Sequence, residues 1–278
     1  MQNFDMIIDF HAHAFPDALA ERSVAYLAAK ANIEHYSDGT VRGLAEAASK
    51  VKTDVALVLP VVTKPSQFRS VNAFAKRIND GEFDSCGMRL RSFGGIHPDS
   101  DNVEGELEEI KAMGLKGVKI HPDYQQTFID DAKNLRIIEK AKELGLLVSV
   151  HAGLDLGFPD CTHCTPVRAK NMLRLTGADN VILAHMGGFD MWQEVFDLLV
   201  GEKVRFDTGV VARYMDKTLA AKIIRAHGAD KVLFATDTPW ASYEDSYNFV
   251  ASLDLTEEEK KRILGLNAAK LLGIEYDL

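Results

Sequence analysis

Two histidines near the start of the chain have the spacing of a metal-binding pair. His11 and His13 are separated by one residue and follow the apolar run 6–10. In a β-strand, side chains two positions apart point to the same face, so both imidazoles can reach one ion. Neutral imidazole nitrogens bind zinc at about 2.0 to 2.1 Å, and manganese, iron and cobalt also accept nitrogen and oxygen ligands. The pair predicts one divalent metal ion, with zinc preferred.

Further histidines and one aspartate stand where other apolar runs end. They are His97, His121, His151, His185 and Asp237. If the runs are parallel strands of a barrel, all of these ends lie on one face, where residues far apart in sequence converge. The sequence therefore predicts a histidine-lined pocket, in which His151 and Asp237 are the best candidates for the third and fourth metal ligands.

The apolar runs have the length of strands and alternate with helical patterns. Eight strands are predicted, at residues 6–10, 55–59, 90–96, 117–120, 146–150, 181–184, 204–207 and 232–236. Apolar residues at helical spacing among charges predict helices at 103–113, 131–144 and 215–226. Eight such units close into a (β/α)₈ TIM barrel, an α/β fold that we expect to form one domain over residues 1–278. An open doubly wound sheet is disfavoured because no G-x-G-x-x-G follows the first strand.

Two segments lie outside the simple repeat. Residues 17–50 contain two helical patterns broken at Ser37-Asp38-Gly39, and we expect this helical insertion after the first strand to form a wall of the site. Near the other end, Thr256 and Glu259 have the spacing of a capping box, which predicts the start of a helix.

The composition narrows the class of protein. The 278 residues are 46% hydrophobic and 26% charged, which is typical of a globular chain and excludes a disordered one. A net charge of −9 with no basic cluster argues against nucleic acid as a partner. No apolar stretch reaches the roughly 18 residues of a membrane span, the first residues do not resemble a leader, and three unevenly spaced cysteines suit a reducing compartment. We expect a cytoplasmic protein with a small-molecule substrate, and a homodimer as the commonest assembly.

Several motifs together resemble a known superfamily. They read D-F-H-A-H-A-F-P, V-S-V-H-A-G, I-L-A-H-M-G-G, F-A-T-D-T-P-W and L-G-L-N-A-A-K-L-L-G-I. The chain, from residue 7 to residue 274, resembles the amidohydrolase superfamily, and within it the amidohydrolase-related family that includes aminocarboxymuconate-semialdehyde decarboxylase and γ-resorcylate decarboxylase. The resemblance implies that His11, His13, His151 and Asp237 hold a single divalent ion, and that His185 is the catalytic histidine beside it.

Such a site supports more than one reaction. A bound zinc lowers the pKa of its water to about 7, so a hydrolase could use the metal-bound hydroxide, with Asp237 taking the proton and His185 polarising the substrate oxygen. This metal-dependent hydrolase of a small molecule is the main prediction. The alternative is a non-oxidative decarboxylase, a lyase, of a small unsaturated or aromatic carboxylic acid. A barrel that only binds a metal or metabolite is disfavoured, because Asp237 and His185 add acid–base capacity.

The fourth predicted strand leaves the number of ions open. Several branches of the superfamily hold a second ion with a carboxylated lysine at this place, and Lys119 lies two residues before His121, on the same face. We expect one ion, with His121 contacting substrate or water. His97, in G-G-I-H-P, is similar to a segment of TatD-like nucleases, but that family expects a bridging glutamate where this chain has Lys119 and His121. The negative net charge also opposes a nuclease.

Other residues near predicted strand ends are candidate substrate contacts. His163 lies in Cys161-Thr162-His163-Cys164, which we interpret as a loop over the barrel mouth because a structural zinc site needs four ligands. Arg213 could hold a substrate carboxylate and Trp240 could cover it. With His97 and His121, these residues complete the predicted substrate-binding set.

Overall fold

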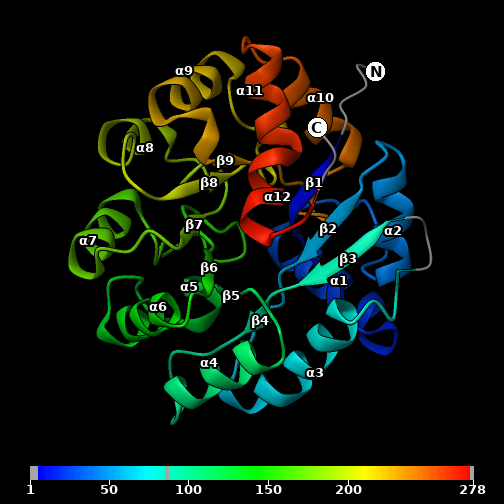
Figure 1. The fold of residues 1–278 in the computed structure, drawn as a ribbon, viewed down its shortest axis with the longest axis vertical. Coiled ribbons are helices and arrows are strands. Elements are labelled where there is room, and N and C mark those ends of the chain that lie inside the picture. The colour runs from blue at the N-terminus through cyan, green and yellow to red at the C-terminus, as the bar shows by residue number, and fades with distance from the viewer. Residues whose placement is uncertain (1–5, 85–87, 276–278) are drawn as a thin grey trace.

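The chain folds as a (β/α)₈ barrel in which parallel strands are surrounded by helices (Figure 1). The computed structural model describes residues 6–84 and 88–275. The strands are β1 Ile8–Ala12, β2 Val55–Val58, β3 Arg89–Ser92, β4 Gly94–Gly95, β5 Gly117–Ile120, β6 Leu147–Val150, β7 Val181–Leu183, β8 Arg205–Asp207 and β9 Val232–Leu233. Every ladder between neighbouring strands is parallel.

The strands form one closed series of eight positions. β3 and β4 are separated only by Phe93, so together they occupy the position predicted for a strand at 90–96. The barrel closes between its first and last strands, because Phe10 N donates to Phe234 O at 2.9 Å and Ala12 pairs with Thr238 in parallel. Side chains from strands on different sides of the barrel, including Ile8, Val55 and Ile182, meet in one buried apolar cluster. The predicted barrel is confirmed.

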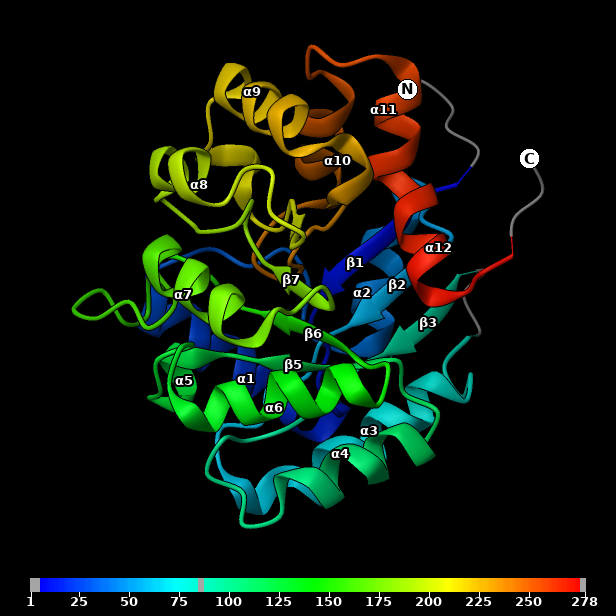
Figure 2. The same cartoon turned by 60° about the vertical axis from the view of Figure 1, so that its left-hand side comes forward.

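The helices cover the outside of the strands (Figure 2). They are α1 Asp17–Ala31, α2 Val41–Ser49, α3 Phe68–Asn79, α4 Val103–Ala112, α5 Pro122–Gln125, α6 Ala132–Glu143, α7 Pro166–Thr176, α8 Trp192–Leu198, α9 Lys217–His227, α10 Tyr243–Ala251, α11 Glu257–Lys261 and α12 Asn267–Leu272. The predicted capping box is present at the start of α11, where Thr256 accepts from Glu259 N and the Glu259 side chain accepts from Thr256 N. Among the described residues, no helix is long and apolar enough to cross a membrane.

The first and the last predicted strands differ most from the structure in their limits. β1 continues past residue 10 to Ala12, so His11 lies inside the strand, where the register against β2 shifts between Asp9 and Ala12. Such a bulge bends the strand and changes the direction in which side chains point. β9 ends at Leu233 because Phe234 N donates to Ile263 O instead of continuing the ladder.

The insertion at residues 17–50 contains α1 and α2. The chain turns between them at Gly39, whose φ of 78° is unfavourable for residues with a Cβ. Thr40 then caps α2 by accepting from Gly43 N at 2.9 Å. α1 buries Ala20, Val24 and Ala28 on one face. Another face is therefore free to line the site.

A buried histidine far from the predicted metal ligands should make the fold sensitive to acid. His227 at the end of α9 donates from Nε2 to Val204 O and accepts from Gly201 N at Nδ1, so the neutral ring satisfies both partners. Burial lowers its pKa from 6.5 to about 4. The unfolded chain therefore binds this proton more readily, and the free energy of unfolding should fall by about 3 kcal/mol as the pH drops from 6.5 to 4.

This expectation is tested by urea unfolding of the metal-free protein at several pH values. In H227Q the free energy of unfolding should depend less steeply on pH over this window than in the wild type. H35Q is the control because His35 is exposed. Equal slopes in H227Q and the wild type would contradict the assignment.

Candidate metal centre and active site

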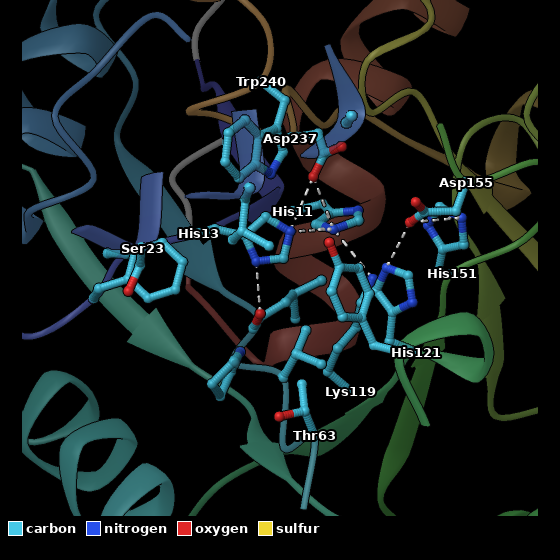
Figure 3. A pocket seen from close by; sticks show the side chains of 18 of the residues that line it. His11, His13, Ser23, Thr63, Lys119, His121, His151, Asp155, Asp237 and Trp240 are labelled. Carbon is cyan, nitrogen blue, oxygen red and sulfur yellow. Dashed lines mark hydrogen bonds and ion pairs between the residues drawn. The ribbon is translucent and has the colours of Figure 1, made fainter. Parts of the chain in front are cut away.

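Three predicted metal ligands meet at the floor of the barrel mouth (Figure 3). His11 Nε2 lies 3.2 Å from His13 Nε2 and 3.2 Å from Asp237 Oδ1, and His13 Nε2 lies 3.0 Å from the same oxygen. Ligand atoms that are each about 2.0 to 2.2 Å from one zinc ion lie roughly 3 to 3.5 Å apart. The two imidazoles and the carboxylate, called the ligand trio below, therefore fit one divalent ion.

Hydrogen bonds orient both imidazoles of the ligand trio. His11 Nδ1 donates to Asp207 Oδ2 at 3.0 Å, and His13 Nδ1 donates to Leu59 O at 2.9 Å. Because a carboxylate and a carbonyl only accept, each ring carries its proton on Nδ1 and turns the Nε2 lone pair toward the shared point. The neighbouring strand ends thus select the tautomer that binds a metal.

The third ligand, Asp237, stands on a constrained turn. Its φ is 66°, and its backbone N–H donates to His11 O at 2.7 Å, which fixes the turn against β1. Burial would raise the pKa of Asp237, but His11 and His13 hold it well below its usual range. The side chain is therefore a carboxylate at all pH values near neutrality, as a metal ligand must be.

Lys119 of β5 reaches the ligand trio. Its Nζ lies 3.1 Å from His11 Nε2, and the residue is only 1% exposed. Burial lowers the pKa of Lys119 to about 8, so at pH 7 the side chain is still mostly an ammonium. A second metal ion held by Lys119 would require a carboxylated lysine, whereas the ammonium adds positive charge that suits an anionic substrate.

His151, the fourth predicted ligand, lies next to His185 rather than within the ligand trio. His185 Nδ1 donates to Gly209 O, and His185 Nε2 lies 3.0 Å from His151 Nδ1, so the two rings share one proton. Burial lowers the pKa of His151 well below 6.5, which favours the neutral ring. The buried His151 Nε2 has no hydrogen-bond partner, which leaves its lone pair available to an ion or substrate.

A second histidine–carboxylate group lies on the other side of His151. His121 stacks on His151 with ring centroids 4.2 Å apart, and Asp155 Oδ2 lies 3.4 Å from His121 Nε2 and 3.8 Å from His151 Nε2. Burial raises the pKa of Asp155 to about 6. His151 therefore lies between two groups of side chains. It contacts His185, which is near the ligand trio, and it contacts His121 and Asp155 on its other side.

Asp207 was not predicted as a site residue, although it ends the predicted strand 204–207. Its Oδ1 accepts from His185 N and Gly209 N, and its Oδ2 accepts from His11 Nδ1. Burial alone would raise the pKa of Asp207, but His11 lowers it to about 2. Its position at a strand end, like that of His151, was the signal that could have identified it.

Replacing Asp207 should weaken metal binding without removing a ligand. In D207N the neutral amide can donate as well as accept, so it no longer holds the proton on His11 Nδ1. Losing a partner that orients a metal ligand reduces metal affinity by about 10- to 100-fold. Competition with a chromophoric chelator measures the affinity. The control is D130N, because Asp130 pairs with Arg168 and Asn171 away from the ligand trio. Unchanged affinity in D207N would contradict this role.

A cavity of about 630 Å³ opens over these residues. Besides the ligand trio, Lys119, His151 and His185, its lining includes the predicted substrate contacts His121 and Trp240. Leu19, Ser23, Tyr26, Leu27 and Lys30 of α1 also line it. The expectation that the insertion forms a wall of the site agrees with this lining.

Three other predicted contacts do not line the cavity. His97 accepts from Asp99 N, and His163 Nδ1 and N both donate to Asp123 Oδ1, so these rings are engaged elsewhere. Arg213 lies at a neighbouring pocket of about 240 Å³ and pairs with Asp245 and Glu34. Cys161 is an exposed free thiol and Cys164 a buried one. Cys86 lies outside the described residues.

Comparisons with known proteins identify the family and similar folds. The sequence model of the family described as amidohydrolase matches residues 8–274. No curated protein matches the chain. Three solved structures are similar over nearly the whole chain. 5-Carboxyvanillate decarboxylase from Sphingomonas paucimobilis is 15% identical with a TM-score of 0.69, and the match covers 98% of this chain and 100% of that one. A dihydroxybenzoic acid decarboxylase from a Polaromonas species, with bound manganese and 2-nitroresorcinol, is 16% identical with a TM-score of 0.71, and the match covers 98% of each chain. A probable 2-pyrone-4,6-dicarboxylic acid hydrolase from Acinetobacter baumannii, with bound citric acid, is 17% identical with a TM-score of 0.67, and the match covers 96% of this chain and 99% of that one. At these identities the similarity shows the fold.

Proposed function

The chain belongs to the amidohydrolase family, and from this premise we propose that it is a metal-dependent decarboxylase of a small aromatic or unsaturated carboxylic acid. The observation that carries the proposal is the Lys119 ammonium, buried 3.1 Å from His11 Nε2 beside the ligand trio. A buried cation next to a metal site favours a substrate that brings a negative charge, because each unpaired buried charge is costly. Two of the similar structures reported above are decarboxylases of carboxylated phenols.

His11, His13 and Asp237 would hold the ion, and His151, which lines the same cavity, is the proposed fourth ligand. A bound divalent ion would supply positive charge that binds the substrate oxygens and stabilises the negative charge developing as carbon dioxide leaves. We propose zinc from the nitrogen-rich ligand set, with manganese as the alternative because one similar structure contains it.

The side chains around the ligand trio provide the rest of the reaction. Lys119 would bind the substrate carboxylate, and the bond between that carboxylate and its carbon would break with the electron pair remaining on the carbon. The proton shared by His151 and His185 would then replace carbon dioxide on that carbon. The histidine pair would take up one proton from solvent, so that the carboxylate and one solvent proton give the decarboxylated product and carbon dioxide. Both rings line the cavity, with His185 Nε2 and His151 Nδ1 3.0 Å apart.

Hydrolysis is the second candidate. The observation that favours it is the position of Asp237, whose carboxylate lies within the ligand trio, where it could accept a proton from a water molecule bound there. One similar structure is that of a probable hydrolase.

Product analysis distinguishes the two reactions. The metal-loaded protein is incubated with carboxyl-labelled hydroxybenzoates and with a panel of amides and lactones, in isotope-labelled water. We expect labelled carbon dioxide and a product that has gained no oxygen from water. Incorporation of water oxygen without release of carbon dioxide would overturn decarboxylation in favour of hydrolysis.

A further inference from the structure

Two helices contribute a set of uncharged side chains to the lining of the cavity. Leu19, Ser23 and Leu27 of α1 follow one another at intervals of four residues, and Val71 and Phe74 of α3 are three apart, so each set lies on one helix face. All five line the cavity. We call these five residues the α1–α3 wall.

The charged groups that line the cavity are outside this set of five residues, although one of them, Lys30, belongs to α1 and lies three residues after Leu27. Within the described chain, four charged side chains line it, namely Lys30, Lys119, Asp155 and Asp237. Lys119 and Asp237 are at the ligand trio, and Asp155 pairs with His121 and His151. The Lys30 ammonium lies over the Phe158 ring, 3.3 Å from its centroid. The α1–α3 wall therefore has no charge of its own.

The wall and the second histidine–carboxylate group lie in different directions from the ligand trio. In Figure 3, Ser23 lies on the opposite side of His13 from His151 and Asp155. A substrate that places its acid group at the trio thus has a polar region on one side and the α1–α3 wall on the other. The cavity of about 630 Å³ has the size of sites that take drug-sized ligands, so it has room for more than an acid group on one small ring.

Exposed apolar side chains gather at the cavity mouth. In the part of the chain that the structure describes, six large hydrophobic residues are exposed, and four of them line this cavity: Leu19 at 42%, Tyr26 at 63%, Leu156 at 37% and Tyr214 at 50%. Single exposed hydrophobic residues are ordinary, but a group of them around a concave site marks a surface that binds an apolar ligand.

We propose that the substrate carries an apolar chain or ring of several carbons, which packs against the α1–α3 wall while its acid group lies at the ligand trio. Leu27 and Val71 are the specificity-determining residues, because they belong to opposite helices of the wall. The placement of the acid group rests on the proposed function, whereas the apolar substituent follows from the wall itself.

A series of linear alkyl hydroxamic acids, from acetohydroxamic to octanohydroxamic acid, tests the proposal by calorimetry. The hydroxamate group binds divalent metals whatever reaction the protein catalyses, so only the tail varies. Each methylene buried against the wall should tighten binding by about fourfold, and hexanohydroxamic acid should bind on the order of 100-fold more tightly than acetohydroxamic acid. The protein is loaded with one equivalent of zinc.

Two variants and a control test whether the alkyl tail of the hydroxamic acid contacts the α1–α3 wall. L27D places a charge in the α1–α3 wall, and V71W fills the space beside the wall with a larger side chain. Both variants should therefore remove most of the gain in affinity per methylene. L175D is the matched control, because Leu175 is 45% exposed on α7 and does not line the cavity. It should keep the full dependence on chain length.

The outcomes separate this proposal from the proposed function. A flat series in the wild type, or the same slope in L27D and V71W as in L175D, would overturn the apolar substituent and leave the metal centre standing. If no hydroxamate of any length bound to the zinc-loaded protein, the metal centre and the proposed function would both be contradicted. A steep series that the wall variants flatten would support the proposal, whichever reaction the product analysis identifies.

Discussion

H11A is expected to lose its stoichiometric metal and at least about 10³-fold of kcat/KM. His11 makes most of the contacts at the ligand trio, since it contacts His13, Asp237, Asp207 and Lys119. Its removal leaves one imidazole and one carboxylate, which bind a divalent ion weakly. The proposed reaction then lacks the charge that stabilises its transition state.

Elemental analysis of the purified protein measures this effect. The wild type should contain about one transition-metal ion per chain, and H11A close to none. H35A is the control, because His35 is exposed and outside the site. H13A serves as a second variant, because the His13 side chain is 14% exposed and its loss should perturb the core less. Full metal content in H11A and H13A would refute the ligand trio, while two ions per chain would assign Lys119 or His121 to a second site.

H185Q should lower kcat by about 10²- to 10⁴-fold while keeping the metal. His185 lies outside the ligand trio, and its ring shares a proton with His151. Glutamine can still donate to Gly209 O, but it cannot carry a proton to the substrate, and proton transfer by a positioned side chain contributes rate factors of this size.

Rate and metal content must be measured on the same sample. The expected result is a kcat far below that of the wild type at an unchanged metal content. H227Q is the matched control, because it makes the same substitution at a buried histidine away from the cavity. Wild-type kcat in H185Q would refute the proton-transfer role, and loss of the metal would show that His185 is a ligand.

The sequence alone was sufficient to predict the barrel and the convergence of His11, His13 and Asp237. Apolar runs of strand length alternate with amphipathic helices, and parallel strands must end on one face of a closed barrel. His11, His13 and Asp237 could therefore be predicted to lie close together, because each stands at or just after the end of a predicted strand. The capping box at Thr256 was also predictable, because it depends only on two residues three positions apart in the sequence.

Only the tertiary structure decided which neighbours surround the ligand trio. Lys119 reaches His11, Asp207 selects the His11 tautomer, and His151 pairs with His185, through contacts between residues 108, 196 and 34 positions apart. The same holds for His163, which Asp123 holds away from the cavity. Strand periodicity determines the face on which a residue lies. The direction of a long or planar side chain depends on donors and acceptors supplied by other strands, and local sequence carries no record of those partners.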